Sequence, residues 1–560
     1  MIVTPPRNTH TRAGWRRTLA AAFLGVTVAA LTLARLDHTP LWDDEARVAI
    51  VARNLLRSGA LTGWDGRNLL GYRNGGWLRP DLSVNNPPVE FVLAALSFRL
   101  LGTTTWAARL PFALIGLAAL LVFAALLRRD FPAQTALRTY AVCGWALSLV
   151  FVLNARQCRY YAPVMLLALL GFQAWRGCLT RRRWRDFAGF AAASIAFFYT
   201  HAYLCALFLV ALALTALVLH RREFDRPAAI KAAAALAVLL AATLPYAWAR
   251  EIWVRPDLGA GGFESNRAVV LWRHLRDLNR IGLAPLPILA SGWWLGWRRR
   301  TQPPGGGPLA DYACMALTFV CLVGLTSPEI TSVEADAAVR FHLPAAPLWI
   351  VVAAAALARI HASGHWGRWL APGLLGVWLT TNLLTLSPGR PGFRWLLPAY
   401  IHELSRPYPT AMSETCRHLE AHARQDDTVL AFPLYNNDPI HFHLGDRLRI
   451  AGALTRDTHL DAARLARLGA PVFREEAAPD WFVAFGAQPE AAALLQYLAR
   501  DRPDAPGAAP ARYERVAVLP VFWFDTSRPE LLDHAFGPRE DFSRDAEAVY
   551  VYRRRPRNGP

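Results

Sequence analysis

Residues 187–219 read FAGFAAASIAFFYTHAYLCALFLVALALTALVL and contain no Asp, Glu, Lys or Arg. About 20 apolar residues cross the hydrocarbon core of a bilayer as a helix, so this stretch is too long for one crossing. Its polar part, Tyr199-Thr200-His201-Ala202-Tyr203, lies in the middle. We therefore predict two membrane helices, over 187–201 and 202–219, that meet at a polar turn.

The same apolar pattern recurs through the first 390 residues of this 560-residue chain, which is 54% hydrophobic. Nine further runs lie near 18–36, 109–127, 139–155, 160–179, 229–248, 281–297, 310–327, 343–358 and 369–387. The seven Cys include no C-x-x-C pair, which excludes a zinc ribbon or a thioredoxin-type site. The pattern predicts a polytopic α-helical membrane protein with about eleven transmembrane helices in residues 1–390.

The formal net charge of +19 is explained by membrane orientation. Cytoplasmic loops of membrane proteins are enriched in Lys and Arg. Here 21 Lys or Arg stand against four acids in six alternate segments: 1–17, 128–138, 176–186, 221–231, 298–308 and 359–368. We predict a cytoplasmic N-terminus, an extracytoplasmic C-terminus and no nucleic-acid partner.

Two apolar stretches leave alternatives open. Residues 89–101 are short for a span, and we expect a helix at the outer interface, with a short tilted span as the alternative. Arg16-Arg17 before the first run also fits a signal peptide. That run lacks a clear small-residue cleavage site, so we expect an uncleaved first helix.

Residues 400–560 read as a soluble extracytoplasmic α/β domain. Strand-like runs at 428–432, 481–485, 516–524 and 548–552 alternate with helical stretches such as 459–468 and 489–500. This region holds 20 Arg and no Lys against 23 acids, whereas a nucleic-acid-binding domain would be basic.

The first outer loop, residues 37–88, contains Leu41–Arg47 with the sequence LWDDEAR. Three consecutive carboxylates directly after a membrane helix are costly near hydrocarbon, although a solvated loop start is the simplest explanation for any one of them. The loop also holds Trp64-Asp65-Gly66 and Asn85-Asn86-Pro87-Pro88. Its six Arg balance six acids, so it is not a polybasic lipid anchor.

The order of a first helix, the acidic pair Asp44-Glu45 and the motif Asn86–Val89 (NPPV) resembles the GT-C glycosyltransferases. The branch is that of the protein O-mannosyltransferases and the aminoarabinose (lipid A) transferases. Ala155–Tyr161 (ARQCRYY) and Val339–Pro344 (VRFHLP) are similar to later family motifs. Asn86 stands where the family usually has His or Lys.

The resemblance implies a polyprenyl-phosphate sugar donor, and as acceptor a protein, a glycolipid or a glycan, at the outer face of a bacterial inner membrane. Residues 1–390 would form the transferase domain, with 37–108 as its first extracytoplasmic loop. Asp44 is expected to be the general base, with Glu45 orienting the acceptor or the base or helping to hold a divalent cation. The expected lipid-phosphate or substrate contacts are Arg156, Arg159, Tyr160, Tyr161, Arg340, His342, Asn86, Pro87 and Pro88.

Other interpretations of these residues exist. An arginine at a helix end often extends to the interface only to keep its charge in water. His441-Phe442-His443 is a weak metal signal, and a structural role is preferred. A lipid or solute transporter is the alternative function, but transporters place polar groups near the bilayer midplane. Here the polar residues gather at outer helix ends.

Overall fold

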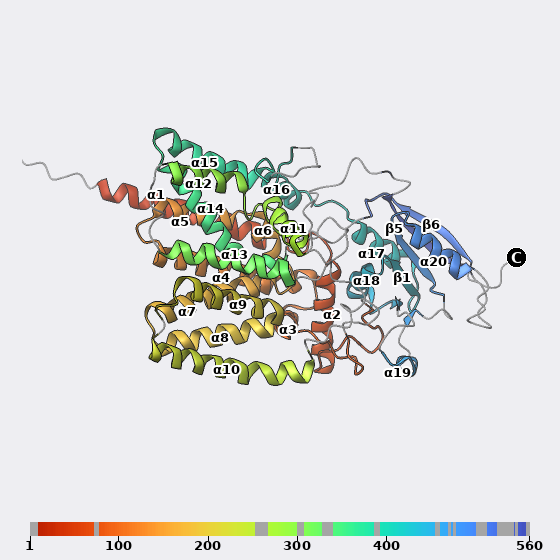
Figure 1. Ribbon diagram of the computed structural model, residues 1–560. Helices are drawn as coiled ribbons and strands as arrows, with labels where there is room; N and C mark the ends of the chain where they lie inside the picture. The colour runs from red at the N-terminus through yellow and green to blue at the C-terminus, as the bar shows by residue number, and fades with distance from the viewer. Residues whose placement is uncertain are drawn as a thin grey trace, which may run out of the picture.

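A computed structural model of the protein describes residues 9–71, 78–223, 225–251, 267–298, 307–326, 340–385, 393–453, 460–468, 472–473, 478–499, 512–523, 543 and 547–555. Within these residues the chain forms a bundle of helices that run side by side, followed by a smaller region built on a β-sheet (Figure 1). Most of the predicted segment 298–308 lies outside the described residues.

Every predicted apolar run contains a helix. The bundle helices are α1 (Thr9–Leu33), α4 (Thr105–Asp130), α5 (Thr135–Ala146), α6 (Leu149–Ala155), α7 (Tyr161–Thr180), α8 (Trp184–Thr200), α9 (Ala202–Leu219), α10 (Arg226–Arg250), α12 (Leu286–Arg298), α13 (Pro308–Thr326), α14 (Ala346–His361) and α15 (His365–Thr380). Of the described residues, five helices are long and apolar enough to cross a membrane, or six if the bent pair α5 and α6 is one span. Three shorter apolar helices accompany them. The chain is thus a multi-pass membrane protein, and the count of eleven crossings stays a prediction.

The predicted break within 187–219 is confirmed. Helix α8 ends at Thr200 and α9 begins at Ala202, with His201 extended between them at φ −160°. The imidazole of His201 accepts from the backbone N–H of Leu204 and so caps the second helix. A polar residue in an apolar run therefore marks the point where the chain reverses.

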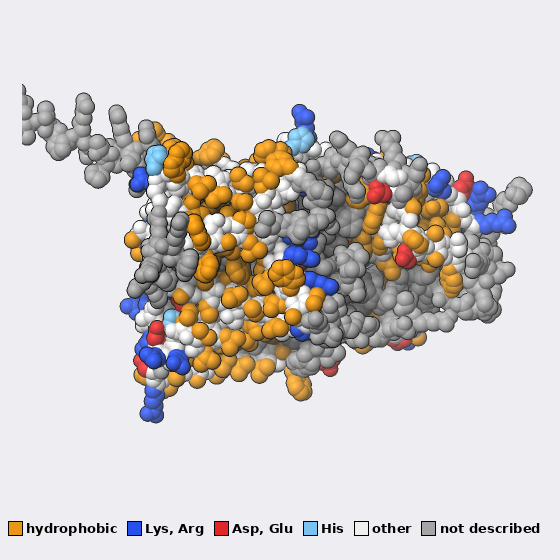
Figure 2. Space-filling view, turned by 45° about the horizontal axis from the view of Figure 1, so that its top comes forward, with side chains coloured by type: hydrophobic (Ala, Val, Ile, Leu, Met, Phe, Trp, Pro, Cys, Tyr) orange, Lys and Arg blue, Asp and Glu red, His pale blue; other side chains and the backbone are white. Residues whose placement is uncertain are grey.

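Three of the predicted basic segments, 128–138, 176–186 and 221–231, meet at one end of the bundle. Arg176 contacts Asp130, Arg182 contacts Asp225, and Lys231 donates to the carbonyl of Arg182 at 2.7 Å. These contacts join three of the six segments to one another. Figure 2 shows hydrophobic side chains covering this face of the bundle, with Lys and Arg at its end opposite the sheet region.

Helix α2 (Asp43–Ser58) crosses the other end of the bundle, between the membrane helices and the sheet region (Figure 1). It is buried along three quarters of its length and ends at Gly59, whose φ of +73° a residue without a Cβ adopts at no steric cost. Helix α3 (Val89–Leu101) packs against α2 and α4. At 13 residues α3 is not among the helices long enough to span.

In addition to the bundle helices, the chain forms two further short helices, α11 (Arg267–Arg280) and α16 (Leu397–Ser405). The sheet region consists of α17 (Ala411–His422), β1 (Thr428–Phe432), η4 (Leu434–Asn436), α18 (Asn437–Leu444), β2 (Arg449–Ile450), β3 (Gly452–Ala453), α19 (Ala462–Arg467), β4 (Val472–Phe473), β5 (Trp481–Phe485), α20 (Pro489–Ala499), β6 (Tyr513–Leu519) and β7 (Val549–Arg554).

The sheet has the order β2-β1-β5-β7-β6, with β1 parallel to both neighbours and β7 antiparallel to β5 and β6. Strand β5 is buried throughout and occupies the centre, whereas the edge strand β6 is largely exposed. The predicted strands at 428–432 and 481–485 are confirmed as β1 and β5, and the one at 548–552 corresponds to β7. The strand predicted over 516–524 overlaps β6 only in part, because β6 begins at Tyr513 and ends at Leu519. The domain boundary near residue 400 stays a prediction.

Candidate active site

The acidic cluster forms the first turn of α2. Trp42 precedes the helix in an extended conformation, and its indole N–H donates to Gln157. Carboxylates at a helix N-terminus interact favourably with the helix dipole, which explains why the helix begins at Asp43. The side chains are not solvated, because Asp44 is 5% exposed and Glu45 is 0% exposed. The solvated-loop interpretation of this cluster is therefore wrong.

Asp44 is the point where three arginines meet. Arg47, one turn along α2, donates to its Oδ1. Arg340 Nη1 lies 3.1 Å from Oδ2, and Arg159 Nη2 lies 3.4 Å from the same oxygen. The structure thus brings together Asp44, Arg159 and Arg340, and their roles stay a prediction.

Glu45 points to a different partner. Arg109 of α4 holds both its oxygens, through Nε at 2.9 Å and Nη2 at 2.6 Å, and the backbone N–H of Cys158 donates to Oε1 at 2.7 Å. Arg109 also donates to the carbonyls of Leu36, Thr39 and Pro40. Glu45 and Arg109 therefore tie the start of the first outer loop to α4.

Arg156 is the predicted phosphate contact that the structure does not bring to Asp44. Its guanidinium donates to the carbonyls of Leu31, Thr32 and Arg35 at 2.9–3.1 Å. A helix leaves its last carbonyls without partners inside the helix. Arg156 satisfies those at the end of α1, which gives it a structural task.

Aromatic rings flank the two arginines on Asp44. The Arg159 guanidinium lies 5.1 Å from the Tyr160 ring and that of Arg340 lies 5.4 Å from the Phe341 ring. Tyr160 packs edge-on against Tyr161 and against His201 at the α8–α9 break, with centroids 4.8 and 4.3 Å apart. Tyr160 and Tyr161 therefore lie at the predicted site.

His342 lies two residues from Arg340 and is fully buried against another histidine. Its Nε2 is 2.8 Å from Nδ1 of His274 on α11. Burial lowers the pKa of His274 to about 4 and places the pKa of His342 well below its ordinary value. This neutral pair connects α11 to the turn that carries Arg340.

The Pro-Pro motif starts α3. Pro88 immediately precedes Val89, and the Asn86 carbonyl accepts from the Tyr246 hydroxyl at 3.3 Å. The motif places Glu90 in the first turn of α3, where Oε2 accepts from the backbone N–H of Tyr160 at 3.0 Å and Oε1 lies 3.6 Å from Arg159. Burial raises the pKa of Glu90 against the opposing charge of Arg159.

The residues at Asp44 do not fit a divalent cation. Both oxygens of Glu45 are bound by Arg109, and guanidinium groups rather than further oxygen ligands surround Asp44. Across the described part of the chain, no group of three or more His, Cys, Asp or Glu is arranged to hold a metal ion. His441 contacts Asp65 at 2.8 Å, as its structural interpretation predicts.

Sequence reasoning missed four residues of this site: Arg47, Glu90, Arg109 and Asp438. Arg47 carried a signal, because it stands three and four residues after Asp44 and Asp43 on a helix. Glu90 carried a weaker one, as the lone acid at the start of an apolar stretch. Arg109 and Asp438 meet the acidic turn only through the fold, since they come from a membrane helix and from the sheet region.

The helical bundle and the buried acidic turn Asp43–Glu45, which arginines from later segments of the chain contact, resemble the GT-C class of membrane proteins. Comparison with known proteins confirms this resemblance in its protein O-mannosyltransferase and aminoarabinose-transferase branch. Residues 85–248 match the family model described as dolichyl-phosphate-mannose-protein mannosyltransferase.

The fold is similar to that of ArnT from Cupriavidus metallidurans in the apo state. The TM-score is 0.54 at 15% identity, over 97% of this chain and 98% of that chain. ArnT from the same organism bound to undecaprenyl phosphate matches with a TM-score of 0.51 at 15% identity, over 96% and 98% of the two chains. No curated protein sequence matches the chain.

Proposed function

We propose that this protein transfers a sugar from a polyprenyl-phosphate donor to an acceptor at the outer face of the membrane, with Asp44 as general base. The observation that carries the proposal is the convergence of Arg159 and Arg340 on Asp44. A base for the acceptor and positive charge for the departing phosphate then occupy one place. The ArnT structure with undecaprenyl phosphate supports a lipid phosphate as the partner of such a fold.

Donor binding changes the partners of the two arginines. In the structure, Arg159 and Arg340 face the Asp44 carboxylate. An incoming lipid phosphate offers more oxygen acceptors than a carboxylate and suits the fork of the guanidinium group. Transfer of Arg159 and Arg340 to the phosphate leaves Asp44 with Arg47, so its carboxylate becomes available to an acceptor hydroxyl.

In the chemical step the acceptor oxygen forms a bond to the anomeric carbon of the sugar while the bond from that carbon to the phosphate oxygen breaks. The acceptor proton passes to Asp44. The electron pair of the broken bond stays on the polyprenyl phosphate, whose added charge Arg159 and Arg340 stabilise. The carboxyl of Asp44 then loses its proton to water.

The protein acts in a bacterial inner membrane, with the N-terminus cytoplasmic and the sheet region periplasmic. The gathering of Arg-rich loops at the end of the bundle opposite the sheet region supports this orientation (Figure 2). Reporter fusions after residues 130, 300 and 420 should read inside, inside and outside. An outside signal after residue 130 contradicts the orientation and indicates that residues 89–101 span the membrane.

Purified protein in nanodiscs with undecaprenyl-phosphate-linked mannose or aminoarabinose, and bacterial membranes as acceptor, tests the reaction. Donor-dependent labelling of protein, glycolipid or glycan, with equal release of undecaprenyl phosphate, is the expected result. The labelled fraction identifies the acceptor class. Flip of the donor across the bilayer without labelling would instead identify a transporter.

A further inference from the structure

The sheet region reaches the acidic turn through helix α18. Phe442 of α18 packs on Phe98 of α3 with ring centroids 6.3 Å apart. Its carbonyl accepts from Arg53 of α2 at 3.2 Å, and the guanidinium of Arg53 lies 5.9 Å from its ring. Helix α18 is therefore seated on the two helices that carry Asp44 and Glu90.

The first turn of α18 places Asp438 beside the base. Asp438 is 3% exposed, and its Oδ2 lies 3.5 Å from Nε of Arg47. Arg47 is 1% exposed and also binds Asp43, at 2.8 Å, and Asp44. The buried guanidinium of Arg47 thus contacts three carboxyl groups. Two belong to its own helix, and the third, Asp438, belongs to the sheet region.

Asp438 is the third buried carboxyl group that contacts Arg47, beside Asp43 and Asp44. Burial raises the pKa of Asp438 well above its ordinary value, and the charges of Asp43 and Asp44 act in the same direction, against Arg47. The Asp438 carboxyl and the Arg47 guanidinium are nevertheless in contact, with Oδ2 3.5 Å from Nε. A contact at this place restricts the orientation of the guanidinium.

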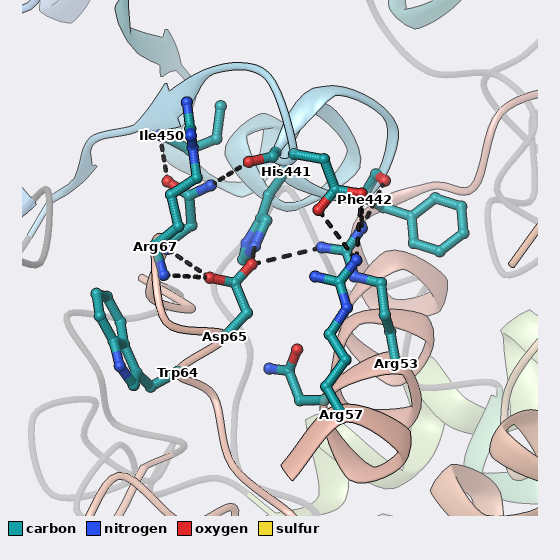
Figure 3. Close-up of polar contacts among 12 residues, drawn as sticks. Arg53, Arg57, Trp64, Asp65, Arg67, His441, Phe442 and Ile450 are labelled. Atoms are coloured by element: carbon teal, nitrogen blue, oxygen red, sulfur yellow. Dashed lines mark hydrogen bonds and ion pairs between the residues drawn. The ribbon is translucent and has the colours of Figure 1, made fainter. Parts of the chain in front are cut away.

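The first outer loop holds α18 in this position (Figure 3). His441 and Arg53 point toward Asp65, with His441 Nε2 at 2.8 Å and Arg53 Nη2 at 3.6 Å from Oδ2. Asn68, which is fully buried, donates to the carbonyls of Gly445 and Leu448 at 2.8 and 3.1 Å and accepts from the backbone N–H of Ile450 at 2.8 Å. The loop that begins with Asp44 therefore also fixes the sheet region.

We infer that the sheet region completes the active site, with Asp438 as a positioning residue that acts through Arg47 on Asp44. This inference rests on the proposed function of Asp44 as the base. Without Asp438, Arg47 loses its contact with the sheet region and can turn, and Asp44 follows because Arg47 is bound to it. A displacement of about 1 Å in a reacting group can lower the rate by roughly 100-fold.

The test compares Asp438→Ala, Asp438→Asn and Asp446→Ala. Asp446 is a matched control for the docking contacts, because it follows the same helix, is 68% exposed, pairs with Arg57 at 3.1 Å and lies 4.0 Å from Arg53, but does not contact Arg47. Transfer is measured with undecaprenyl-phosphate-linked mannose and aminoarabinose and with bacterial membranes as acceptor. Affinity for undecaprenyl phosphate alone is measured in parallel.

For Asp438→Ala we expect kcat to fall by roughly 10–100-fold, with KM for the donor, undecaprenyl phosphate affinity and the unfolding midpoint unchanged. Asp438→Asn should keep most of the turnover, because its amide oxygen can occupy the same place beside Arg47. Asp446→Ala should behave as wild type. Wild-type kcat in Asp438→Ala, or an equal loss in Asp446→Ala, would overturn the inference.

Amide hydrogen exchange of residues 42–48 provides a second readout that needs no sugar. Asp438→Ala should raise exchange in this turn, whereas Asp438→Asn and Asp446→Ala should leave it unchanged. If amide exchange of residues 42–48 does not increase in Asp438→Ala, the coupling between Asp438 and the acidic turn is overturned, whatever the transfer assay gives. If exchange responds but the wild-type protein transfers no sugar, the proposed function fails and the coupling of Asp438 to the acidic turn stands.

Discussion

Arg340 Nη1 lies 3.1 Å from Oδ2 of Asp44, although 296 residues separate the two in the chain. Asp44 opens α2 in the first outer loop, and Arg340 stands in the turn before α14. The contact exists because both segments lie at the same end of the bundle. It pairs the predicted base with a residue predicted to bind the phosphate.

Replacing Asp44 with Asn should remove the base while leaving the shape of the site. We expect transfer to fall by roughly 10²–10⁴-fold, because general-base catalysis typically contributes that much. Turnover of purified protein measures this loss. Asp37→Asn is the matched control, since Asp37 is an exposed acid in the same loop and should leave turnover unchanged. Full transfer by correctly folded Asp44→Asn protein would show that another group accepts the proton.

Replacing Arg340 with Gln should weaken the binding of undecaprenyl phosphate by roughly 10–100-fold, because a hydrogen bond to a charged group is worth about 1.5–3 kcal/mol. Arg340→Lys should lose less, since it keeps the charge but not the two-pronged geometry. Binding is read from intrinsic tryptophan fluorescence in detergent. Exposed Arg99→Gln on α3 is the control, and equal affinity in all three variants would place the phosphate elsewhere.

The sequence predicts the membrane elements well because burial in lipid requires uninterrupted apolar runs. The break at His201 and four of the seven strands in the described part of the sheet region correspond to patterns in the sequence. The sequence does not predict which polar side chains face one another. Asp44 and Glu45 are adjacent in sequence, yet consecutive helical positions point about 100° apart, so one meets Arg159 and Arg340 and the other meets Arg109.

Arg156 and Asp438 show the two ways in which residue type alone is insufficient. From the sequence, an arginine near a helix end could equally bind a phosphate or cap a helix. The structure shows that Arg156 donates to the carbonyls at the end of α1. Asp438 stands in a region whose charges nearly balance, so nothing in its surroundings marks it. Its role depends on how α18 docks on α2, which is a property of tertiary packing.

Glu45→Gln should destabilise the protein, because it leaves the buried guanidinium of Arg109 without its charged partner. Breaking a buried ion pair typically costs about 3–5 kcal/mol. Thermal unfolding in detergent should therefore shift downward for Glu45→Gln and for Arg109→Gln. The double variant should lose less than the sum of the two, since the pair is removed together.

The control for this pair is Arg417→Gln, which breaks the surface contact with Glu414 where the Arg417 side chain is 71% exposed. Exposed pairs contribute about 0–1 kcal/mol, so its midpoint should hardly move. Additive losses in the Glu45 and Arg109 variants would contradict a direct coupling between these two residues.

Acid should loosen the turn that carries Arg340 through the buried pair His274 and His342. In the folded protein the pKa of His274 is lowered to about 4 from 6.5, chiefly by burial, against the charge of Asp277. Between these two values the unfolded chain binds a proton that the folded chain does not, so stability falls as pH decreases from about 6.5 toward about 4. Each unit of pKa shift is worth about 1.4 kcal/mol, which gives about 3 kcal/mol for His274 across this window.

Unfolding at pH 7 and pH 5 in wild type, His274→Gln and His365→Gln measures the effect. The loss of stability between pH 7 and pH 5 should be smaller in His274→Gln. It should persist in His365→Gln, because the side chain of His365 is exposed. An equal loss of stability in all three proteins would assign the acid sensitivity to other groups.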